Sequence, residues 1–154
     1  MLWCALAGAA QIGGVLSGAP FGAPLANLAM SAAYAFILPS VALLHARAAA
    51  HRQSGSILAT IAAAAAVIVG IGAGVTTELR PAALILLGMW WWTVGKMGAE
   101  TGILPRALGF ATATAGVAAF VAAAFVPVGP WLWEAARLAL GVWLITLAVT
   151  FTRR

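Results

Sequence analysis

A set of polar side chains lies within or beside long apolar stretches of this chain, and their types suit the binding of a small polar solute. Asn27, Ser31 and Tyr34 have the i, i+4, i+7 spacing that places three side chains on one face of a helix. Glu134 and Arg137 are three residues apart, so a helix brings the carboxylate near the guanidinium. We expect one polar pocket to be lined by Gln11, Asn27, Ser31, Tyr34, Glu78, Glu134 and Arg137.

Several tryptophans lie deep in the apolar stretches, where they could offer flat rings to a hydrophobic cofactor. Tryptophan is more common at the membrane interface than at this depth. Three of these residues are consecutive, and successive side chains turn by about 100° around a helix, so they cannot all line one pocket. Stacking on a lipid, quinone, carotenoid or chlorin is one interpretation, and space-filling against alanine-rich faces is the other. The residues are Trp90, Trp91, Trp92 and Trp143.

Groups for metal binding or nucleophilic catalysis are few. Cys4 is the only cysteine, which excludes an internal disulfide and a thiolate metal site. His45 and His51 lack the i, i+4 spacing that puts two metal ligands on one helical face, and we expect both on a solvated loop. Since no nucleophile is paired with a base, the sequence predicts a non-catalytic protein without a metal site.

The elements that carry these residues are apolar segments separated by short breaks. Hydrophobic residues make up 64% of the 154 residues and charged residues only 7%. A helix needs about 20 residues to cross the hydrocarbon core of a bilayer. We therefore predict an all-α bundle of six transmembrane helices in a single domain over residues 1–154. The predicted spans are Leu2–Ser17, Pro24–Leu44, Ile57–Thr76, Pro81–Val94, Leu104–Val126 and Trp131–Phe151.

The basic residues are distributed unequally between the two sides of these spans. Six lie on one side, whereas Arg80 alone lies at a break on the other, beside Glu78, where we expect it to reach water. The positive-inside rule then predicts cytoplasmic termini in a bacterial inner membrane. No basic run exceeds two residues, so the net charge of +5 is poor support for nucleic-acid binding. The six are Arg47, Arg52, Lys96, Arg106, Arg153 and Arg154.

Glu134 and Arg137 also permit an interpretation without a ligand. Arg137 would lie roughly 9 Å inside the outer boundary, where an unpaired arginine costs a few kcal/mol. We therefore expect Arg137 to contact Glu134 or Glu78. A structural clamp between helices and an outward-facing pocket both remain open.

Small residues recur every four positions on three of the predicted spans, a pattern typical of helices that pack closely in lipid. We expect Ala66, Gly70 and Ala115 to lie in helix–helix contacts. The three ladders are Ala10, Gly14 and Gly18; Ala62, Ala66, Gly70 and Gly74; and Ala111, Ala115, Ala119 and Ala123.

A G-x-L-P-R-x-L-G turn spans residues 102–109. It resembles a turn that opens a late helix in small uncharacterised bacterial multispan membrane proteins, and the likeness covers about residues 84–120. Pro105 suits a helix start and Arg106 a cytoplasmic anchor. The resemblance implies a membrane fold and no particular activity.

Three functions fit this sequence. The first is an accessory or interaction subunit of a larger membrane assembly, which contacts the bilayer and other membrane subunits or a second copy of the chain. The second is a solute-binding membrane component of a transporter, with the outward-facing polar pocket. The third is a binder of a hydrophobic cofactor. Small size and the lack of an extramembrane domain favour the first.

Overall fold

The computed structural model describes residues 2–16 and 31–152, and every regular element in this part of the chain is helical. The predicted all-α fold is therefore confirmed. A helical segment spans Ser31–Ala49, and its second part is α3. The elements are α1 (Leu2–Leu16), α3 (Leu38–Ala49), α4 (Gln53–Val75), the 3-10 helix η1 (Thr77–Leu79), α5 (Arg80–Thr101), α6 (Arg106–Phe125) and α7 (Trp131–Thr152).

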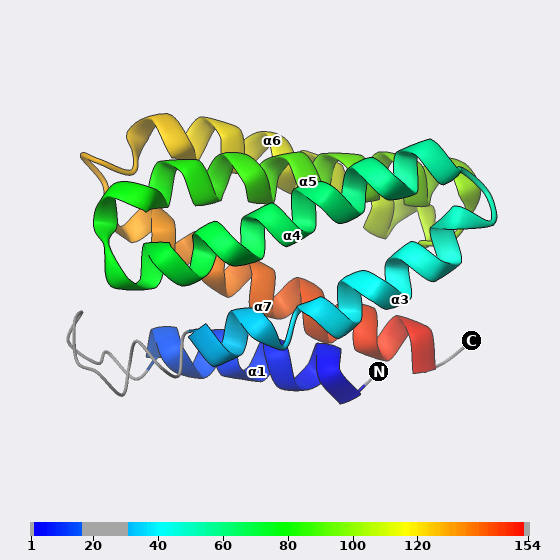
Figure 1. The fold of residues 1–154 in the computed structure, drawn as a ribbon, viewed down its shortest axis with the longest axis horizontal. Coiled ribbons are helices and arrows are strands. Elements are labelled where there is room, and N and C mark those ends of the chain that lie inside the picture. Colours follow the sequence, from blue (N-terminus) through cyan, green and yellow to red (C-terminus); the bar gives the residue numbers. More distant parts are fainter. Residues whose placement is uncertain (1, 17–30, 153–154) are drawn as a thin grey trace.

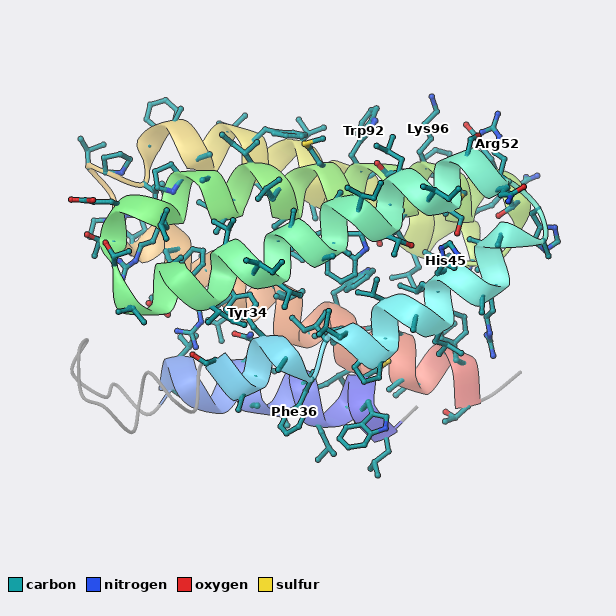
Figure 2. All side chains as sticks on the ribbon, in the orientation of Figure 1. Tyr34, Phe36, His45, Arg52, Trp92 and Lys96 are labelled. Carbon is teal, nitrogen blue, oxygen red and sulfur yellow. The ribbon has the colours of Figure 1, made fainter. Side chains whose placement is uncertain are left out.

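The helices lie roughly side by side along the long axis of the molecule (Figure 1). α5 packs against both α4 and α6, α3 packs against α4, and α1 packs against α7. α1 begins and α7 ends at the same end of the bundle, which also holds the α3–α4 and α5–α6 turns. Arg52 and Lys96 lie at this end as well (Figure 2). We name it the basic end, and the end that holds η1 and the start of α7 the opposite end.

Within residues 2–16 and 31–152, four helices are long and apolar enough to cross a membrane: Ser31–Ala49, Gln53–Val75, Arg106–Phe125 and Trp131–Thr152. α1 is a shorter apolar helix. α5 is as long as α7 but is not among the four. The described helices are thus compatible with a membrane protein.

Two helices continue beyond the ends of the membrane spans predicted within them. The span Pro81–Val94 stops before Lys96, but α5 continues to Thr101, because exposed charged side chains near a helix end do not interrupt its backbone hydrogen bonds. Gly102 then ends the helix, with a φ of 74° that favours glycine. The span Pro24–Leu44 likewise stops before the helix ends at Ala49.

The closest backbone approach joins α5 to α6. A Cβ atom on Gly88 would lie 2.9 Å from the carbonyl oxygen of Gly116, and one on Gly95 would lie 2.6 Å from that of Gly109. Gly88 and Gly95 are seven residues apart on α5, and Gly109 and Gly116 are seven residues apart on α6. Because the two helices are antiparallel, each glycine of one helix faces a glycine of the other. Glycine lets two helix backbones touch, which strengthens their van der Waals packing where no water drives them together.

The four-residue ladders are confirmed in part. Ala66 and Gly70 are buried on α4, and a Cβ on Gly70 would lie 2.5 Å from the Tyr34 ring. On α6, Ala115 is partly buried against the core, whereas Ala111 is exposed. The ladder on α4 is therefore an interface throughout, and the one on α6 only in part.

Candidate functional site

The predicted pairing of Arg137 is confirmed. This residue lies in the second turn of α7, and its side chain is 3% exposed. Its Nη1 donates to Oε2 of Glu134 at 2.8 Å, and its Nε donates to Oε1 of Gln11 on α1 at 3.2 Å. The guanidinium therefore bonds within its own helix and also ties α7 to α1.

The shape of α1 makes room for this guanidinium. A Cβ atom on Gly14 would lie 2.8 Å from Nη2 of Arg137, so a side chain at position 14 would collide with it. Six residues earlier on α1, Gly8 approaches Gly141 of α7, since a Cβ on Gly8 would lie 2.6 Å from the Gly141 carbonyl oxygen. The two backbones are therefore close together at this point. The small residues of α1 thus pack against α7 and its buried Arg137 side chain. They do not pack against one of the other four-residue ladders.

Gln11 is fully buried, and only half of its amide is satisfied. Oε1 accepts the bond from Arg137, while Nε2 has no hydrogen-bond partner within residues 2–16 and 31–152. A buried amide nitrogen without a partner is uncommon, and water, a ligand or another polar group usually satisfies it. Within the described residues, Nε1 of Trp133 is a second buried polar atom near this cluster that has no hydrogen-bond partner.

The other predicted pocket residues do not all join Arg137. Tyr34 is buried and stacks on Trp133, with the ring centroids 6.5 Å apart and the planes 20° apart. Ser31 is half-buried in the same helical segment as Tyr34. Glu78 is exposed on η1, and the ion pair of Arg137 goes to Glu134 instead. Asn27 lies outside the described residues.

Arg80 is buried, although we expected its side chain to reach water. Its residue is only 8% exposed, and its guanidinium carbon lies 5.9 Å from the centre of the Trp133 ring, within the range of a cation–π contact. Burial lowers the pKa of Arg80, an effect that the Glu134 carboxylate opposes. The opposite end of the bundle therefore holds two buried guanidinium groups, one on α5 and one on α7.

The space next to this cluster is small. A cavity lined by Tyr34, Trp133 and apolar side chains of α4, α5 and α7 measures about 10 Å³. That is close to the room taken by one water molecule. A solute would therefore need helices or side chains to move before it could enter this cavity.

Three of the four candidate cofactor tryptophans pack on one another. The Trp90 and Trp143 rings meet edge to face, with centroids 5.3 Å apart, and Trp91 lies 6.1 Å from Trp143. Nε1 of Trp143 donates to Oγ1 of Thr112 at 2.8 Å, which connects α7 to α6. Trp92 differs because it is 45% exposed. This packing agrees with the space-filling interpretation, and cofactor binding stays a prediction.

His45 lies inside α3 and contacts α4, so its predicted place on a solvated loop is wrong. Its Nδ1 is 2.8 Å from Oγ of Ser56 and 2.8 Å from Oγ1 of Thr60. A serine beside a histidine has the geometry of an activated nucleophile. Ser56 is only 1% exposed, however, and the cavity beside it measures about 10 Å³, so no substrate carbonyl could reach the hydroxyl. The three side chains hold α3 against α4.

No family model, curated protein or solved structure matches this chain. Within the described residues, no three or more His, Cys, Asp or Glu side chains gather as metal ligands.

Proposed function

We propose that this chain is a non-catalytic integral membrane protein that acts as an accessory or interaction subunit of a larger membrane assembly in a bacterial inner membrane. The observation that carries this proposal is that several polar side chains inside the described bundle bond to one another across helix interfaces. Their hydrogen-bonding capacity serves helix packing, as expected for a structural subunit. The pairs are Arg137 with Gln11, Trp143 with Thr112, Cys4 with Ser40, and His45 with Ser56 and Thr60.

The outer surface supports the same proposal because it is apolar on helices that flank the bundle. On α4, Ile61 and Ile68 are 62% and 70% exposed. On α6, Val121 and Phe125 are each 56% exposed. Such faces suit contact with lipid or with another subunit and do not suit water.

Six membrane crossings with cytoplasmic termini are part of this proposal. α5 runs beside α6, and α1 runs beside α7 (Figure 1). The less apolar helix α5 and the short apolar helix α1 therefore each run along a neighbour that is long and apolar enough to cross. Basic residues at one end of the bundle then mark its cytoplasmic side.

We expect reporter fusions made after Arg52 and after Arg80 to lie on opposite sides of the membrane, with the Arg52 fusion inside. α4 separates these positions and is apolar enough to span the bilayer. Activity of a cytoplasm-specific and a periplasm-specific reporter at each position measures this. The same side for both fusions would remove α4 from the membrane and contradict the topology.

Native mass spectrometry of the protein ejected from its own membrane tests the assembly role. We expect a mass well above the 15.6 kDa of the single chain, with a second polypeptide or a second copy in constant ratio. Ile68→Trp on α4 and Val121→Trp on α6 form a matched pair, because lipid accepts a bulky ring on an exposed face and a packed interface does not. Loss of the partner in one variant would identify the contact face. A single chain that carries only a small molecule would contradict the proposal.

One observation favours the second function, solute binding by a transporter component. Nε2 of Gln11 is buried beside Arg137 without a partner among the described residues, so an acceptor oxygen of a solute would satisfy it. The same mass spectra distinguish the two functions, since a bound solute should be lost from a Gln11→Met variant. Cofactor binding by the tryptophans is a third proposal, and the visible absorption of the purified protein tests it.

A further inference from the structure

The outer face of the α5–α6 hairpin contains a groove. Because glycines bring the two backbones together, longer side chains on either side of the contact stand outward and form its walls. The groove encloses about 620 Å³, which lies within the range of small-ligand sites. This is far more room than the cavities beside Tyr34 and His45 offer.

The groove changes from basic to apolar along its length. Lys96 on α5 and Arg106 on α6 line it at the basic end, and both side chains are exposed. One helical turn deeper, Trp92 and Phe110 are 45% and 65% exposed. Figure 2 shows Trp92 and Lys96 pointing away from the bundle on the same side. Val117, further along α6, continues the apolar part.

The two basic groups keep their charge available for a ligand. The acidic residue in the groove, Glu100, forms an ion pair with Arg52, which immediately precedes α4. Within the described residues, neither Lys96 nor Arg106 belongs to an ion pair. α6 also begins at this end, and no side chain caps it. The N–H groups of its first turn therefore point toward the basic end without a hydrogen bond from a capping side chain. Positive potential therefore gathers at one end of an apolar groove.

We propose that this groove binds an anionic phospholipid, with the headgroup phosphate between Lys96 and Arg106 and an acyl chain along Trp92, Phe110 and Val117. Basic pockets between helices at a membrane surface hold anionic headgroups, and tryptophan favours the headgroup level. Trp92 lies about 6 Å below Lys96 along the helix, which is the order of groups in a lipid. The inference rests on the proposed crossing of the membrane by α5 and α6, and it is independent of the proposed assembly role.

Charge complementarity distinguishes this occupant from others. An apolar helix of a partner or of a second copy would cover Lys96 and Arg106 without a counter-charge, which is costly. A free phosphate would satisfy the basic groups but leave the aromatic part of the groove empty. A phospholipid with a negative headgroup satisfies both parts.

The test uses the purified full chain in detergent, with native mass spectrometry to count bound lipid. Phosphatidylglycerol and phosphatidylcholine with the same acyl chains are added in parallel. We expect phosphatidylglycerol to bind at least about fivefold more tightly, since each basic group near a membrane surface contributes about that factor. Lys96→Gln and Arg106→Gln should each reduce phosphatidylglycerol binding about fivefold. They should reduce phosphatidylcholine binding less, because the choline group of that lipid offsets the charge of its phosphate.

Arg47→Gln is the matched control, because Arg47 lies at the same end of the bundle but stacks over Phe151, outside the groove. It should leave the lipid preference unchanged. Glu100→Gln should strengthen phosphatidylglycerol binding, since it removes the negative charge from the groove. Trp92→Ala combined with Phe110→Ala should weaken both lipids, because the acyl chain loses its contacts.

Several outcomes would overturn the proposal. Equal binding of the two lipids would show that the headgroup charge is not recognised. An unchanged preference in Lys96→Gln and Arg106→Gln, or the same loss in Arg47→Gln, would place the lipid elsewhere. Full competition by soluble glycerol phosphate would indicate a phosphate site rather than a lipid site, and a second copy that excludes lipid would indicate a protein interface. Thermal unfolding of each variant confirms that the fold is retained.

Discussion

Gly95→Ala should destabilise the protein, even though alanine is the better helix former. The new Cβ atom would lie 2.6 Å from the Gly109 carbonyl oxygen and would also collide with the backbone of Ala113. Backbone atoms cannot rotate away as a flexible side chain can, so α5 and α6 must separate. We expect a loss of about 1–3 kcal/mol in the free energy of unfolding, measured by thermal or denaturant unfolding in detergent.

Gly13→Ala provides the matched control for that experiment. Gly13 also lies inside a helix, but a Cβ atom there would meet nothing within 4 Å. The substitution therefore brings only the higher helix propensity of alanine, worth up to about 1 kcal/mol. Opposite signs for the two variants would locate the effect in the contact between α5 and α6. A gain in stability for both would mean that these helices are not in backbone contact.

Arg137→Leu is the second substitution with a large expected effect. It removes the donor to Oε1 of Gln11, so a fully buried amide keeps no hydrogen bond among the described residues. Glu134 loses its partner as well, but its side chain is 36% exposed and can turn to water. We therefore expect a loss of about 2–4 kcal/mol in the free energy of unfolding, most of it from the stranded amide and the lost contact with α1.

A double-mutant cycle separates these two causes. Gln11→Leu in the Arg137→Leu background replaces the stranded amide by an apolar side chain, so it should restore part of the lost stability. Gln11→Leu alone should destabilise, because Nε of the buried guanidinium loses its acceptor on Gln11, while the bond to Glu134 is kept. Additive losses across the cycle would show that Gln11 and Arg137 do not interact, and the tie between α1 and α7 would then be wrong.

The sequence predicted the helices well because long apolar stretches leave the backbone little choice but to form its own hydrogen bonds. Helix ends were harder. Lys96 ended the apolar pattern, but the α5 backbone continued until Gly102 provided a left-handed stop. His45 was placed on a loop because charged neighbours follow it. α3 continues past it, and Ser56 and Thr60, four residues apart on α4, supply its hydrogen bonds.

The sequence predicted the contacts of the candidate site that lie within one helix, but not those between helices. Spacing within one helix predicted the pair of Glu134 and Arg137, because three residues on a helix fix the geometry. Spacing cannot tell which helix packs against which, so the bond from Arg137 to Gln11 and the exposed place of Glu78 needed the fold. Arg80 was expected in water because it precedes a span, but Trp133 on α7 covers it.

The sequence contains a second pattern, besides the four-residue ladders, that indicates how α5 packs against α6. Gly88 and Gly95 are seven residues apart, and so are Gly109 and Gly116. In a hairpin that turns near Gly102, the two spacings put each glycine opposite another. Alanine is so frequent in this chain that its ladders say little, whereas rarer glycines in matching register are more informative.

The pairing of α1 with α7 has a consequence for the order of events during synthesis. α5 and α6 are neighbours in sequence, so their hairpin can form as soon as both helices have left the ribosome. α1 emerges first among the described helices, yet its main partner in the bundle emerges last. Until α7 arrives, the Gln11 amide and the glycine face of α1 have no match. In the membrane topology proposed above, α1 would therefore lie beside lipid until α7 is made, and we expect the bond from Arg137 to Gln11 to be among the last to form.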